Sequence, residues 1–373
     1  MRISERLRTV PVSGIRKMFD LAASDSINLS LGEPDLPPPA DALEGMNDAA
    51  MKGQNGYGPT PGIMRLREAV AERYSDYGVK SDNVMITPSG TSALMTVTQS
   101  IVDTGDETLI PNPGFVVYGP HTILSSGRPV EYTLTDDFQP DIDDIQRKIT
   151  KRTKAIFLNY PSNPTGGVLS ESSLRAVRDI ANDKKITVVS DEVYEPFVYD
   201  DVHRTFVSEL DNAIVVNSFS KMMAVTGWRI GFIISRDDVI PDITKMQYHM
   251  CACPSVPAQY GILNAMPAVD QYLNSVRNTY KKRRNIISSR INEIEGLSMK
   301  EPRGAFYAFP SFSFEMTSEK FAMELVRNGL VCVPGSAFGT CGEGHLRFSY
   351  AADERKICIG MNILEKVANE LRG

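Results

Sequence analysis

The chain has 373 residues, of which 42% are hydrophobic and 23% are charged, a composition that is ordinary for a folded globular protein. At this length we expect two domains rather than one compact core. The formal net charge of −6 and the lack of a long basic block argue against a nucleic-acid partner, and no apolar run is long enough to span a bilayer.

The first part of the chain predicts helices joined by loops rich in glycine and proline. Residues 2–28 read as a helix and a loop, and further helices are expected near residues 40–52 and over residues 63–77. The loop at residues 56–62 is so rich in glycine and proline that it holds Tyr57 outside regular structure. Taken alone, Tyr57 would be an ordinary turn residue.

A strand, a turn of small residues and a helix follow. The apolar pattern predicts the strand over residues 83–87 and the helix over residues 93–102. Between them, small residues leave backbone N–H groups and hydroxyls free to bind a phosphate at the start of the helix. Many strand-to-helix turns look like this, so the three residues are a weak signal alone: Ser89, Gly90 and Thr91.

Buried strands and helices then alternate along the chain. A helix is expected over residues 171–182 with Ser170 as its N-cap, and strands at residues 108–111, 155–158, 186–189 and 213–216. This order predicts a parallel sheet with helices on its faces, and such sheets bind ligands beyond the carboxyl ends of their strands. Four polar residues lie just beyond such ends and can share one edge of the sheet: Asn163, Asp191, Tyr194 and Lys221.

The strongest chemical signal is the stretch at residues 218–231. It lies between two apolar runs, which places Lys221 at the end of an expected strand. Ser218, Ser220 and Arg229 can converge on one phosphate, and Lys221 between them could form a Schiff base with a nearby carbonyl. A single lysine is most often a solvated surface charge, but Ser-x-Ser-Lys followed by Gly-x-Arg-x-Gly is far less common by chance.

The remainder of the chain predicts a smaller domain. A helical region runs from residue 236 to about 249, and a long charged helix over residues 271–294 is expected to lead into the second domain. We interpret its basic run at residues 281–284 as a solvated face. The small domain is expected to contain strands at residues 305–309, 330–333 and 345–350 and a closing helix at residues 355–371.

Cysteines and the start of the chain favour a cytoplasmic protein. Residues 1–10 lack the continuous hydrophobic core of a signal peptide. The five cysteines are an odd and scattered set, which fits a reducing compartment better than a disulfide framework. Cys251 and Cys253 have no second pair of thiols, so we expect no metal site and interpret these residues as buried free thiols.

Taken together, the motifs resemble the class I and II pyridoxal-phosphate (PLP) aminotransferases, the aspartate aminotransferase superfamily of fold type I. The resemblance covers nearly the whole chain in the family's order: Gly32-Glu33-Pro34-Asp35, Tyr57 with Gly62, Ser89-Gly90-Thr91, Asn163-Pro164-Thr165-Gly166, Asp191-Glu192-Val193-Tyr194, the Lys221 stretch and His345-Leu346-Arg347-Phe348-Ser349. It implies an α/β fold, with a mostly parallel seven-stranded sheet flanked by helices in a large domain over residues 31–274. A smaller α+β domain would be built from residues 1–30 and 275–373.

The resemblance also implies a cofactor, pyridoxal 5'-phosphate, and a catalytic set consisting of Lys221, Asp191 and Tyr194. Asp191 would pair with the pyridine nitrogen, Asn163 and Tyr194 would donate to the phenolic oxygen, and Lys221 would carry the proton. Phe115 would stack on the ring, although core packing is an open alternative for any phenylalanine. The implied phosphate-binding residues are Ser89, Gly90, Thr91, Ser218, Ser220 and Arg229, with Tyr57 from the partner subunit of a homodimer.

Gly32, Asn163 and Arg347 are the implied substrate-binding residues. A guanidinium grips a carboxylate with two parallel hydrogen bonds, so Arg347 is expected to bind the substrate α-carboxylate. A structural ion pair is the alternative reading. In a strand, Leu346 and Phe348 would project to the opposite face and leave Arg347 alone on its side.

The expected activity is transfer of an amino group from an amino acid, of aspartate or aromatic type, to a 2-oxo acid such as 2-oxoglutarate. The alternative is a PLP-dependent β-lyase of the same fold, because both reactions begin with the same proton abstraction. A non-catalytic sensor of this fold would need a DNA-binding domain, and we expect none. Neither cation known from the aspartate subgroups is present for a distal carboxylate, and the substitutes in the sequence are Arg16, Lys17 and His249.

Overall fold

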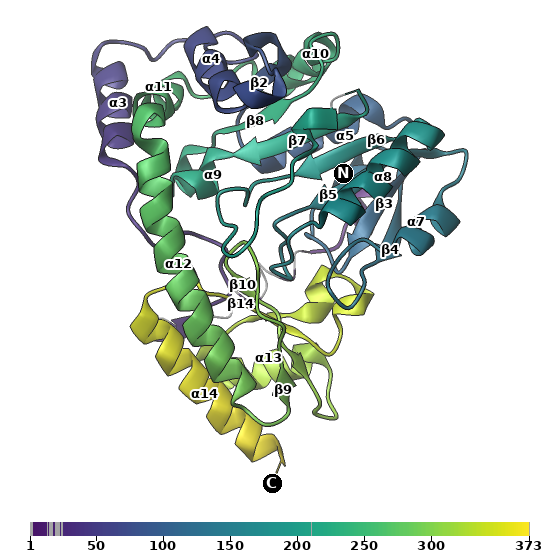
Figure 1. Cartoon of the computed structure of the whole chain (residues 1–373), viewed down its shortest axis with the longest axis vertical. Helices are drawn as coiled ribbons and strands as arrows, with labels where there is room; N and C mark the ends of the chain where they lie inside the picture. Colours follow the sequence, from purple (N-terminus) through teal and green to yellow (C-terminus); the bar gives the residue numbers. More distant parts are fainter. Residues whose placement is uncertain are drawn as a thin grey trace.

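The computed structural model describes residues 3–12, 14, 18, 23, 25–209 and 211–372 (Figure 1). The upper part in Figure 1 is a large sheet with helices on both faces, and the lower part contains short strands and helices near the C-terminus. The long helix α12 (Val269–Asn292) runs from the upper part down into the lower part.

The central sheet has seven strands in the order β2-β8-β7-β6-β5-β3-β4. Neighbouring strands from β4 to β7 are parallel, and β8 is antiparallel to both β7 and β2. The predicted α/β class with a mostly parallel sheet is therefore confirmed. The strands are β2 (Val84–Thr87), β3 (Glu107–Asn112), β4 (Arg128–Thr133), β5 (Thr153–Asn159), β6 (Thr187–Asp191), β7 (Ala213–Ser218) and β8 (Gly231–Ile234).

The sheet is buried on both faces because successive side chains of each strand point to opposite sides. In β5, Ile156 and Leu158 pack into one hydrophobic cluster, whereas Ala155 and Phe157 pack into another. The first cluster is covered by α4 (Met64–Arg73), α7 (Ile142–Lys148), α8 (Glu171–Lys184) and α11 (Val256–Ala265). The second is covered by α5 (Gly90–Ile101), α6 (Tyr118–Leu124) and α10 (Ile240–Cys251). Helix α3 (Ala40–Met51) lies against α11.

Two helix starts show how side-chain caps fix the boundaries. Ser170 is the N-cap of α8, as predicted, and its Oγ accepts a hydrogen bond from the Ser173 N–H at 3.0 Å. Helix α5 begins at Gly90, earlier than residue 93, because the Ser89 Oγ caps it by accepting from the Ser92 N–H at 2.9 Å. The predicted turn of small residues is therefore the first turn of the helix itself.

The lower part joins segments from both ends of the chain. Strand β1 (Ile27–Asn28) pairs in parallel with β12 (Leu330–Val331). Strand β14 (Leu346–Ser349) lies between β10 (Tyr307–Ala308) and β13 (Val333–Pro334), and β9 (Leu297–Ser298) pairs with β11 (Ser311–Phe312). Helices α13 (Ser318–Arg327) and α14 (Glu354–Arg372) pack around their own hydrophobic cluster. Helix α1 (Glu5–Thr9), in contrast, packs beside α6 of the upper part. The strands expected here are present but shorter than predicted.

The interpretation of the basic run on α12 as a solvated face is wrong for two of its residues. Arg283 and Arg284 are buried and pair with Asp35 at 2.6 Å and with Asp200 at 2.8 Å. Both arginines share a helix face with Tyr280, three and four residues before them, and that face packs inward. A run of four adjacent cations therefore wraps around the helix instead of lining one side.

The interpretation of the cysteine pair as buried is also wrong. All five cysteines are free, but Cys251 is exposed, Cys253 is partly exposed and only Cys332 is fully buried. The described residues contain no group of three or more histidine, cysteine or acidic side chains placed to hold a metal ion. Within the same residues, no helix is both long and apolar enough to cross a membrane.

Candidate active site

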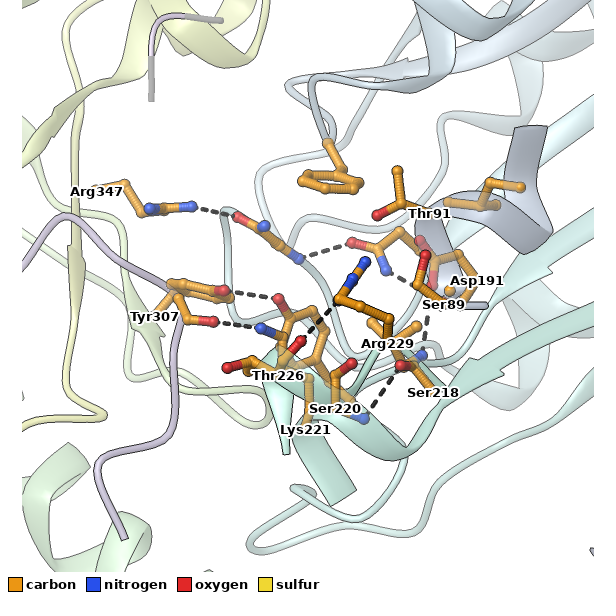
Figure 2. A pocket seen from close by; sticks show the side chains of 18 residues that line it. Ser89, Thr91, Asp191, Ser218, Ser220, Lys221, Thr226, Arg229, Tyr307 and Arg347 are labelled. Atoms are coloured by element: carbon orange, nitrogen blue, oxygen red, sulfur yellow. Dashed lines mark hydrogen bonds between the residues drawn. The ribbon is translucent and has the colours of Figure 1, made fainter. Parts of the chain in front are cut away.

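One pocket at the carboxyl edge of the central sheet gathers nearly all the candidate site residues (Figure 2). Figure 2 shows Arg347 and Tyr307 entering from the side of the lower part, opposite Ser89, Thr91 and Asp191. The predicted residues that line it are Gly32, Ser89, Gly90, Thr91, Phe115, Asn163, Asp191, Tyr194, Ser218, Ser220, Lys221, Arg229 and Arg347. Residues not predicted from the sequence also line it: Leu94, Asn159, Val193, Thr226 and Tyr307.

The start of α5 and the short helix α9 (Phe219–Met222) form one end of the pocket. Ser218 ends β7, and its Oγ accepts from the Ser220 N–H at 3.2 Å and donates to the Ile230 carbonyl at 3.2 Å. The Ser220 Oγ is buried and has no hydrogen-bond partner among the residues that the structure describes. A buried hydroxyl without a partner is costly, so this group is positioned for a ligand atom.

Close backbone packing brings these two helix starts together. A Cβ on Gly231 would lie 2.6 Å from the Gly90 nitrogen, so only glycine lets β8 approach the first turn of α5 this closely. Because N–H groups in the first turn of a helix have no acceptor within the helix, those of Gly90 and Thr91 are available to an anion. Arg229 adds a positive charge from a left-handed backbone conformation with φ of 59°, and its guanidinium donates to the Thr226 carbonyl at 2.8 Å.

Lys221 lies in α9, three residues beyond the end of β7, and its Nζ donates a hydrogen bond to the Gly32 carbonyl. Burial lowers the pKa of Lys221 to about 8. The negative charge of Glu33 opposes this shift, and the positive charges of Arg229 and Arg347 add to it. At pH 7 about a tenth of this amine is therefore unprotonated, far more than for an ordinary lysine, and able to act as a nucleophile or a base.

Asp191 ends β6, and burial raises the pKa of its carboxyl group to about 7. Tyr118 donates a hydrogen bond from its hydroxyl to Oδ2 at 2.7 Å, and the Val193 N–H lies 3.4 Å from Oδ1. Asn159, paired with Asp191 across β5 and β6, donates to the Asp191 backbone carbonyl at 3.0 Å. In the part of the chain that the structure describes, this carboxylate has no cationic partner.

Arg347 lies in β14 with only 1% of its surface exposed. As predicted, Leu346 and Phe348 pack into the hydrophobic cluster of the lower part while Arg347 faces the pocket. Its guanidinium donates to the Asn163 Oδ1 at 2.9 Å and to the Ser30 carbonyl. Among the described residues no carboxylate pairs with Arg347, which argues against the alternative of a structural ion pair.

Two predicted residues are placed by aromatic contacts. The Tyr194 hydroxyl lies 2.6 Å from the Tyr307 hydroxyl. Phe115 meets Tyr118 edge to face, with ring centroids 5.8 Å apart, at the wall of the pocket. Asn159 could have been found from the sequence, since it follows the same strand-end rule as Asp191, whereas nothing adjacent in the sequence marks Tyr118 or Tyr307.

Tyr57 is the predicted residue that does not line the pocket of its own subunit. It is 93% exposed in the loop between α3 and α4. His249, a substitute considered for binding a distal carboxylate, is exposed on α10 and also lies away from the pocket lining. The other two substitutes, Arg16 and Lys17, lie outside the described residues.

The sequence matches the family model described as aminotransferase class I and II over residues 24–359. The chain belongs to this family. Membership of this family explains why its motifs resemble those of the class I and II aminotransferases.

Relatives of this aminotransferase align with it over almost the full length of each of the two sequences compared. A probable aspartate aminotransferase of Methanocaldococcus jannaschii is 36% identical, over 98% of this chain and 99% of the relative. An aromatic-amino-acid aminotransferase of Thermococcus litoralis is 37% identical, over 99% of each. The solved structure of Thermus thermophilus aspartate aminotransferase with maleate superposes with a TM-score of 0.93 at 30% identity, over 98% of this chain and 100% of that one. The protein is an enzyme, a transaminase.

Proposed function

We propose that this aminotransferase binds PLP at Lys221 and moves an amino group from aspartate or an aromatic amino acid to a 2-oxo acid such as 2-oxoglutarate. One observation carries the proposal: three buried groups in a single pocket each lack a partner that cofactor and substrate would supply. Lys221 is an amine of lowered pKa. Within the described ranges, Asp191 is a carboxyl group with no cation beside it, and Arg347 is a guanidinium with no carboxylate beside it.

The residues present fit the cofactor at each of its polar positions. The unpartnered Ser220 hydroxyl, the first turn of α5 and Arg229 would hold the phosphate, together with Ser218. Asp191 would face the ring nitrogen, because a cation there relieves the cost of a buried carboxylate. Phe115 would pack against the ring face.

PLP, when bound, supplies an electron sink that withdraws the electrons left by the departing α-proton. Asp191 would hold a proton on the ring nitrogen, and Asn163 and Tyr194 would donate hydrogen bonds to the phenolic oxygen. Lys221 would take and hold the proton of the substrate α-carbon, a role for which a pKa of about 8 is well matched. Arg347 binds the α-carboxylate and orients the substrate beside Lys221.

Substrate choice is supported by the relatives, which are named for aspartate and for aromatic amino acids. Among the described lining residues the cations are Lys221, Arg229 and Arg347, and each already has a role. A distal carboxylate would therefore need a cation from the partner subunit or from a residue such as Arg16 or Lys17. Transamination is favoured over the β-lyase alternative because these relatives are named aminotransferases.

Incubation of the purified enzyme with a single amino acid tests the reaction. We expect aspartate or an aromatic amino acid to convert the bound cofactor to its pyridoxamine form and yield the matching 2-oxo acid, because the amino group stays on the enzyme. Alanine and lysine serve as comparison substrates, and absorbance together with product analysis gives the rates. Release of pyruvate and ammonia from serine or cysteine, without an aminated cofactor, would instead identify the β-lyase.

The raised pKa of Asp191 predicts that the stability of the cofactor-free protein depends on pH. The ordinary pKa of an aspartate side chain is 3.8, whereas burial raises that of Asp191 to about 7, so the folded state binds this proton more tightly than the unfolded chain. Stability contributed by this group therefore falls as pH rises from about 4 to about 7, by up to about 4 kcal/mol. Asp191→Asn should remove this fall, as measured by urea unfolding at pH 4, 5.5 and 8.

The exposed Asp103 provides the matched control, since Asp103→Asn changes the same formal charge on the surface. Its pH profile should follow that of the parent. If Asp191→Asn and the parent lose stability in parallel across this pH range, the buried carboxyl group is not the cause. Adding PLP to the parent should restore stability at pH 8, because a cation then faces Asp191.

We also propose the domain division at residues 31–274 against 1–30 with 275–373, supported by separate hydrophobic clusters and by the pairing of β1 with β12. A homodimer is proposed because Tyr57 is exposed on its own subunit and would complete the phosphate site of the partner subunit. A cytoplasmic location is supported by the five free cysteines.

Mixed dimers test the shared site. In a heterodimer of Lys221→Ala and Tyr57→Phe subunits, one site receives both defects and the other receives neither. We expect this heterodimer, purified with two different tags, to have half the kcat per dimer of the parent with parental KM, because one intact site remains. If each site is built from one subunit, the heterodimer will instead show half the activity of the Tyr57→Phe homodimer, with the KM of that variant.

A further inference from the structure

Tyr307 lies in β10 and is buried at the meeting point of three site residues (Figure 2). Its hydroxyl oxygen is 2.6 Å from that of Tyr194, and the two rings meet edge to face with centroids 5.5 Å apart. The guanidinium of Arg347 lies over the ring of Tyr307, 4.6 Å from its centroid. One side chain therefore contacts the residues proposed to bind the cofactor oxygen and the substrate carboxylate.

The third contact is with Gly32. A Cβ at this position would lie 1.8 Å from the Tyr307 hydroxyl oxygen, so the absence of a side chain at Gly32 is what admits the hydroxyl. The carbonyl of Gly32 accepts the hydrogen bond from Lys221 Nζ. The Tyr307 hydroxyl is therefore held in one place between the segment that contacts Lys221 and the phenol of Tyr194.

The hydroxyl protons of Tyr194 and Tyr307 have a single arrangement when Tyr194 donates a hydrogen bond into the pocket. Burial raises the pKa of both Tyr194 and Tyr307, so each keeps its proton at neutral pH. Two O–H groups in contact share one hydrogen bond, which leaves the other proton free for a different acceptor. If Tyr194 donates into the pocket, Tyr307 must donate to Tyr194, and such a chain strengthens the second bond.

The guanidinium of Arg347 is held differently. It lies between two rings, that of Tyr307 at 4.6 Å and that of Phe338 at 4.9 Å, with no carboxylate beside it in the described part of the chain. Aromatic faces stabilise a buried cation without neutralising it, so the arginine remains free to bind an anion. Phe338 contributes a ring without a hydroxyl and does not line the pocket, which makes it the natural control.

We propose that Tyr307 is a positioning residue with two separable roles, donating its hydroxyl proton to Tyr194 and supporting Arg347 with its ring. This inference rests on the proposed function of the pocket. In this proposal Tyr307 does not act on the amino group or on the α-proton. It orients Tyr194, which would tune the cofactor, and Arg347, which would bind the substrate.

Three variants separate the two roles. Tyr307→Phe removes the hydroxyl and keeps the ring, Phe338→Leu removes only the other ring, and Tyr307→Leu removes both functions of Tyr307. The first readout is the pKa of the visible absorption band of the Lys221-linked cofactor, titrated in the holoenzyme. The second is the Kd of two carboxylates that lack an amino group, maleate and 3-phenylpropanoate, measured by their effect on that band.

We expect Tyr307→Phe to raise the spectroscopic pKa by about 0.2–0.6, because a weaker Tyr194 bond stabilises the deprotonated oxygen less, and to leave Kd within about twofold. Phe338→Leu should raise Kd about 3- to 30-fold and leave the spectroscopic pKa unchanged. Tyr307→Leu should show both changes. Thermal unfolding confirms that each variant is folded. If Tyr307→Leu does not fold, Tyr307→Phe still decides the role of the hydroxyl, and Tyr307→Met, which keeps more of the side-chain length without an aromatic face, replaces Tyr307→Leu in the test of the ring.

A Tyr307→Phe holoenzyme that titrates like the parent would overturn the hydroxyl role. Equal loss of carboxylate binding in Tyr307→Phe and Tyr307→Leu would overturn the role of the ring. A parent enzyme without a titratable band at Lys221 would instead contradict the proposed function, and the inference would fall with it. Failure of the inference and failure of the function therefore give different results.

Discussion

Replacing Lys221 with alanine is expected to lower kcat for transamination by a factor of about 10⁴ or more, because one side chain supplies both the covalent attachment and the proton transfer. The pocket offers no second amine among its described lining residues. Single-turnover measurements with the best amino acid give the rate of the first half-reaction. Borohydride reduction of the parent followed by peptide mapping should place the pyridoxyl group on Lys221.

Lys221→Arg provides the matched control for charge. An arginine keeps the positive charge near Arg229 but stays protonated, so it can neither attack a carbonyl nor accept a proton. We therefore expect it to be as inactive as the alanine variant. A label on another lysine would show that Lys221 is not the site of attachment. An arginine variant that retains several per cent of the parental rate would show that Lys221 acts mainly through its charge.

Arg347→Ala is expected to weaken every amino acid substrate together. The guanidinium is buried beside Asn163 and has no carboxylate partner in the described residues, so its binding capacity is available to the substrate. Loss of a charge-assisted bidentate pair in a desolvated site costs about 2–5 kcal/mol, which is roughly a 30-fold to several-thousand-fold fall in kcat/KM. The measurement is kcat/KM for one acidic, one aromatic and one aliphatic amino acid.

Arg347→Lys tests geometry at constant charge, because an ammonium cannot form two parallel hydrogen bonds to a carboxylate. We expect it to recover only part of the loss, with the order of substrates unchanged. A loss confined to the acidic substrate would make Arg347 a residue that selects the side chain. In that case the α-carboxylate site would have to be sought elsewhere in the pocket.

The pocket could be anticipated from the sequence where a residue lies at the carboxyl end of a buried strand or within a few residues beyond it. Asp191 and Lys221 obey that rule, and the register between β5 and β6 brings Asn159 beside Asp191 at the same edge. Tyr118 and Tyr307 could not be found this way, because their partners Asp191 and Tyr194 are 73 and 113 residues away. The contact of Tyr118 depends on how α6 packs against the sheet, and the contact of Tyr307 depends on how the two parts of the molecule meet.

In the fold, too, features that depend on nearby residues could be predicted, whereas features that depend on distant segments could not. Central strands such as β5 are continuous apolar runs because helices cover both of their faces. The edge strand β4 is only partly buried and carries no such run, so the apolar pattern does not predict it. The buried Arg283 and Arg284 look like surface residues in sequence, since their acidic partners are supplied by segments far along the chain.

The pairing of β1 with β12 has a consequence for how the protein is made. Ile27 is opposite Leu330, so β1 leaves the ribosome well before its partner strand, which follows 303 residues later. At ordinary rates of translation this delay is roughly 15 to 60 s. The central sheet can assemble during that time, but Ser30, which follows β1 and accepts a hydrogen bond from Arg347, docks only near the end. The nascent chain therefore acquires Arg347, the arginine proposed to bind the substrate, well after the strands of the central sheet, and a product terminated between them would lack that arginine.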